Sequence, residues 1–211
     1  MKLYGFPPSP RTWAVRAVAA QLGVPLDFEF VDLTKGQQHE PDYRAINPNG
    51  RAPTLVDGDF KLWEAMAIMH YLAGQKPTAL WPDDMRIRAD IVRWQSWNLA
   101  HWEKESCAPL LFERIVKQLV GAGAPDEAAV ARALDNFARD AKVLEAHLGK
   151  QPYLVGSSLT LADFSVAGPL FYAERAGLPL ADYPKVREWF GRIASLPCWK
   201  ETAPQIPAAA A

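Results

Sequence analysis

The chain has 211 residues, of which 49% are hydrophobic and 22% are charged, and its formal net charge is −1. This composition can fill a core, and an even charge balance without a basic block argues against a nucleic-acid partner. Residues 1–20 contain prolines and two arginines, and no apolar stretch in the chain is long enough to cross a bilayer. We therefore expect a soluble, cytoplasmic protein with no membrane partner.

Strand and helix patterns alternate in the first part of the chain. Strands are expected over residues 2–4, 26–31, 54–56 and 60–63, the last two joined by the Asp57-Gly58 turn. Helices are expected over residues 10–22, ended by Gly23, and 64–73, ended by Gly74, and the polar segment 34–46 has room for a short helix. This order predicts a small α/β domain over residues 1–76.

The remaining sequence is helical in pattern. Residues 77–85 contain two prolines and paired aspartates, which is typical of a linker. Helices are expected over residues 86–120 (one long or broken helix), 126–148, 160–176 and 185–196, with a short piece near Trp199 and a frayed tail over 208–211. We predict an α+β fold, in which the α/β domain is followed by an all-helical domain over residues 86–211.

Cysteine and histidine spacing gives no metal-binding pattern. Cys107 and Cys198 are 91 positions apart, and the four histidines are scattered along the chain. We expect two free thiols and no metal site.

Ser9 directly precedes Pro10, at the expected start of the first helix. The simplest interpretation is that Ser9 caps this helix, with Pro10 at its first position. A hydroxyl at a helix N-terminus is also well placed to stabilise a bound anion or thiolate. Both interpretations are compatible with the sequence.

A second candidate site lies within residues 47–72. A cis bond before Pro53 is a minority outcome, roughly one X-Pro bond in twenty, but it would leave the Ala52 backbone free to pair with an extended peptide. Glu64 is either an ordinary first-turn carboxylate or the acceptor for an ammonium group, beside a carboxylate bound at the Ala65 N–H. An α-amino-acid end carries both of those groups.

These residues together resemble a glutathione S-transferase. The resemblance rests on a strand followed by Pro-Pro-Ser at 7–9, the Ala52-Pro53 step, Leu-Trp-Glu-Ala at 62–65 and the helix that follows. Gly-Ser-Ser-Leu-Thr-Leu-Ala-Asp at 156–163 is similar to the N-capping box of that family, which makes Asp163 structural. The resemblance implies a thioredoxin-like first domain that binds glutathione and a helical second domain that shapes a pocket for a hydrophobic electrophile.

The resemblance also implies roles for single residues. Ser9 matches the catalytic serine of the phi, theta and zeta groups, with Thr12 in reserve. The implied glutathione-binding residues are Gln38, His39, Arg51, Ala52, Pro53, Glu64 and Ala65. The implied electrophile pocket includes Trp13, Trp97 and His101, although core packing is the better interpretation for at least two of the tryptophans 94, 97 and 102. Glutathione would be the co-substrate of a homodimeric enzyme.

Two departures from the family pattern leave other functions open. Ala65 stands where the family usually has serine, and Gln37-Gln38-His39 stands where relatives often have His-Lys. The loss of a hydroxyl at position 65 favours a non-catalytic ligand-binding or regulatory interaction module. A glutathione-dependent isomerase is a further alternative, although Ser9 is followed by Pro10-Arg11 and not by the Ser-Cys run of the zeta-like group.

Overall fold

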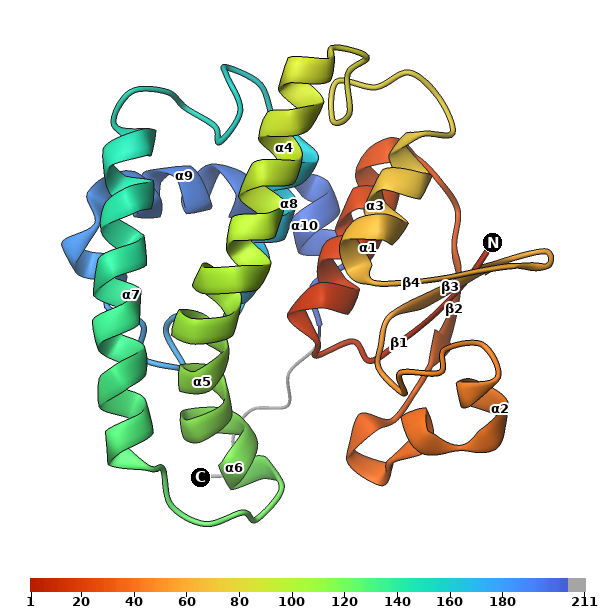
Figure 1. Ribbon diagram of the computed structural model, residues 1–211, viewed down its shortest axis with the longest axis horizontal. Helices are drawn as coiled ribbons and strands as arrows, with labels where there is room; N and C mark the ends of the chain where they lie inside the picture. The colour runs from red at the N-terminus through yellow and green to blue at the C-terminus, as the bar shows by residue number, and fades with distance from the viewer. Residues whose placement is uncertain (205–211) are drawn as a thin grey trace. The chain divides into compact units, whose positions relative to one another are not determined.

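The computed structural model describes residues 1–204 (Figure 1). The chain forms two compact units, one made of residues 1–78 together with the C-terminal segment that starts at Leu196, and one made of residues 79–195. The predicted division differs at the C-terminus, because it assigned every residue from 86 onward to the second domain. The predicted frayed tail, 208–211, lies outside the described residues.

The first unit contains a four-stranded mixed sheet. Its strands are β1 (Lys2–Gly5), β2 (Asp27–Phe30), β3 (Thr54–Asp57) and β4 (Phe60–Trp63). They are ordered β2-β1-β3-β4, with β2 parallel to β1 and the other two pairings antiparallel (Figure 1). All four predicted strands are present. Leu3 and Leu55, which face each other in the β1–β3 register, are fully buried and form part of the core.

Helices complete the first unit. They are α1 (Pro10–Leu22), the 3₁₀ turns η1 (Leu33–Lys35) and η2 (Gln37–His39), α2 (Pro41–Arg44), α3 (Ala65–Ala73) and α10 (Pro197–Glu201). Helices α1 and α3 pack against each other (Figure 1). Helix α10 packs on α1, where the rings of Trp13 and Trp199 have centroids 4.0 Å apart. This contact explains why the C-terminal helix groups with the first unit.

The second unit is helical. Its elements are α4 (Met85–Trp97), η3 (Asn98–Cys107), α5 (Ala108–Leu111), η4 (Phe112–Val116), α6 (Lys117–Leu119), α7 (Glu127–Leu148), α8 (Leu161–Ala167), η5 (Gly168–Tyr172), η6 (Leu180–Asp182) and α9 (Pro184–Ala194). The predicted helix over 86–120 is present, with two π-helical stretches, η3 and η4. The helix predicted over 160–176 is shorter. Its α-helical part ends at Ala167, and Pro169 has no N–H with which to continue the ladder.

Aromatic rings fill the core of the second unit. Trp102 is fully buried, its indole donates to the Val166 carbonyl at 3.1 Å, and its ring centroid lies 4.9 Å from that of Phe137. Trp94 is 5% exposed, so the prediction that at least two of these tryptophans are core residues is confirmed. Both cysteines are free, as the sequence predicts, and both are buried.

The capping box at α8 is also confirmed. One oxygen of Asp163 accepts from the backbone N–H and the hydroxyl of Thr160, at 2.8 and 3.1 Å. Its other oxygen accepts from the N–H of Leu154 and from the indole of Trp189, each at 2.9 Å. With its four acceptor positions occupied and no exposed surface, Asp163 holds the second unit together.

Within residues 1–204, no helix has both the length and the apolar character needed to cross a membrane. The same residues contain no group of three or more His, Cys, Asp or Glu side chains that could hold a metal ion.

Candidate functional site

The strand register brings the predicted site loops to one edge of the sheet. Thr54 in β3 pairs with Tyr4 in β1 on one side and with Trp63 in β4 on the other. Tyr4, Thr54 and Trp63 therefore lie side by side across the three strands. Within a residue or two of them lie the loop after β1, the segment before β3 and the start of α3. Two predicted segments, Ala52-Pro53 and Glu64-Ala65, directly adjoin these paired residues in sequence.

Ser9 caps α1 with its side chain. Its Oγ accepts from the Thr12 backbone N–H at 3.4 Å, while its own N–H donates to the Phe6 carbonyl at 2.8 Å. A hydroxyl that accepts a cap bond keeps its hydrogen for another acceptor. The first turn of α1 has no acidic residue, so the positive end of the helix dipole is not neutralised there. Ser9 can therefore act as a donor to a bound anion.

Thr12 does not fit the reserve catalytic role. Its side chain is fully buried, and a Cβ added at Gly5 would lie 2.4 Å from its Cγ2. This packing places Thr12 beneath the end of β1, where its hydroxyl cannot meet a ligand. Its Oγ1 has no hydrogen-bond partner among the described residues. The prediction of Thr12 as an alternative to Ser9 is therefore corrected by its burial.

The predicted helix over residues 64–73 included Glu64. In the structure Glu64 instead precedes α3, which begins at Ala65. Its φ is 73°, and among residues 1–204 it is the only residue other than glycine with a positive φ. Such a conformation costs of order 1–3 kcal/mol and persists where the surrounding structure imposes it. No side chain caps α3, so the N–H groups at its start, beginning with Ala65, remain available to an anion.

Ala52 and Pro53 are joined by a cis peptide bond, the less common of the two forms considered from the sequence. The carbonyl of Arg51 accepts two hydrogen bonds, from the Tyr43 hydroxyl and from the Asn47 side-chain amide, each at 2.7 Å. The Arg51 side chain is exposed. The backbone of this segment is thus held from the buried side.

Gln38 and His39 form the 3₁₀ turn η2 and lie against the same loop. Gly50 has a φ of +61°, and a Cβ there would come within 3.0 Å of the Gln38 carbonyl oxygen and of His39 Nδ1. The structure therefore brings the Gln38–His39 turn against Gly50, the residue before Arg51. Their side chains differ in exposure, with His39 exposed and Gln38 partly buried.

The chain matches two family descriptions, "Glutathione S-transferase, N-terminal domain" over residues 1–74 and "Glutathione S-transferase, C-terminal domain" over residues 127–192. It is also 38% identical over 214 residues to glutathione S-transferase 3 of Zea mays, covering 98% of this chain and 95% of that protein. The chain belongs to the glutathione S-transferase family.

Solved structures agree with this assignment. Glutathione S-transferase III in its apo form superposes with a TM-score of 0.85 at 36% identity, covering 100% of this chain and 98% of that one. Glutathione S-transferase-I bound with the ligand lactoylglutathione gives a TM-score of 0.86 at 26% identity, with 96% and 97% covered. The predicted fold, a thioredoxin-like domain followed by a helical domain, is confirmed.

Trp13 is not the pocket residue that the family resemblance implied. It has no exposed surface, its indole donates to the Thr202 hydroxyl at 3.0 Å, and its ring packs on Trp199. Trp13 is a core residue of the first unit, which joins α1 to the C-terminal helix. The sequence spacing could not show this, because the partner residues are almost the whole chain away.

The other two implied pocket residues lie in the second unit. Trp97 is partly buried, with its ring centroid 5.4 Å from Trp94 and 6.0 Å from Trp102, and His101 is exposed. That they contact an electrophile stays a prediction.

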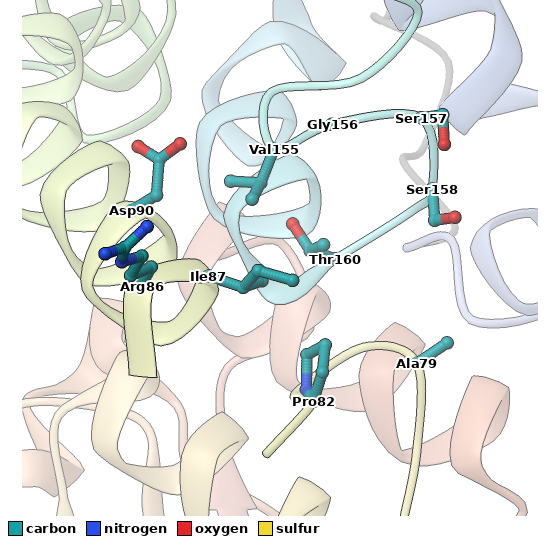
Figure 2. Close-up of a pocket in the computed structure, with 10 residues that line it drawn as sticks. All are labelled: Ala79, Pro82, Arg86, Ile87, Asp90, Val155, Gly156, Ser157, Ser158 and Thr160. Carbon is teal, nitrogen blue, oxygen red and sulfur yellow. The ribbon is translucent and has the colours of Figure 1, made fainter. Parts of the chain in front are cut away.

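A groove of about 610 Å³ in the second unit contains none of the predicted site residues (Figure 2). Its lining residues are Ala79, Pro82, Arg86, Ile87, Asp90, Val155, Gly156, Ser157, Ser158 and Thr160. Figure 2 shows Arg86 and Asp90 on one wall and the two serines on the opposite side. Asp90 is paired with Arg93, and the two serines are exposed. Thr160 is buried, but its hydroxyl donates to Asp163, so the lining residues offer no free buried polar group that points to a particular ligand.

Proposed function

We propose that this protein catalyses the addition of reduced glutathione, through its thiolate, to small hydrophobic electrophiles, and that it acts as a cytoplasmic homodimer. One observation carries the catalytic part of the proposal. Ser9 uses a lone pair to cap α1 and keeps its hydroxyl hydrogen for a sulfur anion at the helix N-terminus. The relative whose structure contains lactoylglutathione supports the choice of ligand.

The γ-glutamyl end of glutathione fits the start of α3. The exposed Glu64 carboxylate would accept from the ammonium group, and the Ala65 N–H would donate to the carboxylate. The Ala52 backbone, next to the cis bond, would pair with the cysteinyl residue. Gln38, His39 and Arg51 would supply the contacts to the glycine carboxylate.

The expected energies are sufficient for thiolate formation. A free thiol has a pKa of about 8.5, and lowering it by about two units requires roughly 2.7 kcal/mol. A hydrogen bond from a hydroxyl to an anion contributes about 1.5–3 kcal/mol, and a helix N-terminus adds about 0.3–1 kcal/mol. Ser9 and the dipole of α1 together reach this sum without a general base.

The test is the Ser9→Ala variant. Turnover should fall roughly ten- to a hundredfold, because one charge-assisted hydrogen bond is lost, while glutathione affinity stays within a few-fold. The pH at which bound glutathione forms its thiolate, followed by the ultraviolet absorbance of the thiolate, should rise in parallel. Ser158→Ala, at an exposed position in the second unit, is the matched control and should behave as the unmodified protein. Near-normal turnover in Ser9→Ala would contradict the assigned role.

A second candidate, a non-catalytic glutathione-binding or interaction module, is favoured by one observation. Ala65 is 7% exposed and offers a backbone N–H but no hydroxyl to the γ-glutamyl carboxylate. A pH titration of bound glutathione separates the two functions. A thiol that binds with an unshifted pKa, or glutathione that does not bind, supports the module.

A further inference from the structure

A ring of buried hydrogen bonds lies directly behind the Ala52 segment. Its members are Tyr43 of α2, Asn47 of the following loop and Thr54 of β3, which are 7%, 2% and 0% exposed. The ring is closed by the backbone carbonyl of Arg51. None of these groups was singled out from the sequence.

The donors and acceptors of the ring can be assigned one by one. The Tyr43 hydroxyl donates to Arg51 O at 2.7 Å, so its contact with Thr54 Oγ1, at 2.9 Å, must use the Thr54 hydrogen. The two hydrogens of the Asn47 amide go to Arg51 O at 2.7 Å and to Thr54 Oγ1 at 3.0 Å. Every donor has an acceptor, and a fully satisfied buried network of this kind specifies one geometry.

The consequence for the site follows from peptide geometry. Arg51 O and the Ala52 N–H belong to the same peptide unit, which is trans, and in a trans peptide the C=O and N–H bonds point in opposite directions. Two donors fix the carbonyl toward the buried ring, so the Ala52 N–H must point away from it. No hydrogen bond to this N–H is found within residues 1–204.

Asn47 also holds the loop on its other side. Its Oδ1 accepts from the Asn49 N–H at 3.0 Å, and its carbonyl accepts from the Gly50 N–H at 3.0 Å. Gly50 is the residue that packs against Gln38 and His39. Asn47 therefore contacts the Arg51 peptide through its side-chain amide and Gly50 through its backbone carbonyl.

We propose that Tyr43 and Asn47 are positioning residues, which hold the Arg51–Ala52 peptide so that its N–H is presented to the cysteinyl backbone of glutathione. This inference rests on the proposed function for the identity of the ligand, although the orientation of the peptide does not depend on it. Neither residue touches the ligand. Both act through the carbonyl that they share.

The test compares Tyr43→Phe with Tyr71→Phe in the full-length protein. Both changes remove one phenolic hydroxyl from the first unit, but Tyr71 donates to Asp57, at the opposite end of β3. Tyr43→Phe should weaken glutathione binding, measured by calorimetry, by about two- to tenfold, the range for one lost neutral hydrogen bond. The KM for glutathione should rise equally, while kcat and the KM for the electrophile stay unchanged. Tyr71→Phe should bind glutathione normally.

Asn47→Ala is the stronger variant and should weaken glutathione binding further. If Asn47→Ala does not fold, the comparison of Tyr43→Phe with Tyr71→Phe decides the test by itself. Equal glutathione affinities in Tyr43→Phe and the unmodified protein would overturn the inference, and so would equal losses in Tyr43→Phe and Tyr71→Phe.

A second readout separates this inference from the proposed function. If the unmodified protein does not bind glutathione, the proposed function fails, and the Ala52 amide resonance then tests the positioning role. Tyr43→Phe should shift and broaden that resonance by nuclear magnetic resonance, whereas Tyr71→Phe should leave it in place. An unchanged Ala52 resonance in Tyr43→Phe would overturn the positioning role.

Discussion

The backbone conformation at Glu64 allows stability and glutathione binding to be separated. Its φ of 73° is unfavourable for any residue with a Cβ, at a cost of order 1–3 kcal/mol. Glycine removes that cost but adds about 0.4–1 kcal/mol of backbone entropy to the unfolded chain. Glu64→Gly should therefore be more stable than Glu64→Ala by roughly 1 kcal/mol, which corresponds to about 2–4 °C in Tm for a chain of this size.

Both variants should lose glutathione affinity together. Each removes the carboxylate proposed to accept from the γ-glutamyl ammonium, so each should bind roughly ten- to a hundredfold more weakly, as expected for a lost charge-assisted hydrogen bond. Urea denaturation measures the stability difference, and calorimetry measures the affinity. The matched control is Ala131→Gly, at an exposed position within α7, which should lose about 0.5–1 kcal/mol.

Replacing alanine by glycine should change the free energy of unfolding in opposite directions at positions 64 and 131, and this difference decides the test. Glycine at an ordinary helical position destabilises, and glycine at a strained position stabilises relative to alanine. If Glu64→Gly is no more stable than Glu64→Ala, the backbone there is not strained and the reasoning is refuted.

Two further predictions concern the second unit. Asp163→Asn should lower the free energy of unfolding, measured in urea, by about 3 kcal/mol, because the new amide nitrogen would face the N–H of Leu154 or the indole N–H of Trp189. An unchanged stability would contradict the structural role of Asp163. The hydrogen bond from the Lys117 ammonium holds the pKa of Glu113 below its usual range, so this carboxylate stabilises the fold at neutral pH and loses that effect as the pH falls below about 4. Glu113→Gln should therefore be less stable than the unmodified protein at neutral pH, and the difference should shrink as the pH falls below about 4, as measured by denaturation at several pH values.

Local signals in the sequence account for most of the elements. Ser9-Pro10 and Gly23 fix the two ends of α1 through a side-chain cap and a left-handed residue, and both devices act within a few residues. The Asp57-Gly58 signal predicts the β3–β4 hairpin in the same way, and in the structure Asp57 pairs with Phe60 across a turn made of Gly58 and Asp59. Features of this kind depend on neighbouring residues, so the chain sequence alone predicts them.

Features that depend on distant contacts could not be predicted in this way. Trp13 has the spacing of a helix face, but its role follows from Thr202 and Trp199, more than 180 residues later in the chain. The same contact moves α10 into the first unit. The burial of Thr12 likewise depends on Gly5, across the loop that carries Ser9.

The candidate site is hard to recognise from side chains because much of it is backbone. Two of the proposed ligand contacts come from the N–H groups of Ala52 and Ala65, and any residue other than proline supplies an N–H. Their directions are set elsewhere, by Tyr43 and Asn47 in one case and by the start of α3 in the other. The missing hydroxyl at position 65 therefore removes one contact and leaves the N–H in place. A change at Tyr43, which contacts no ligand, should alter the geometry of the peptide that does.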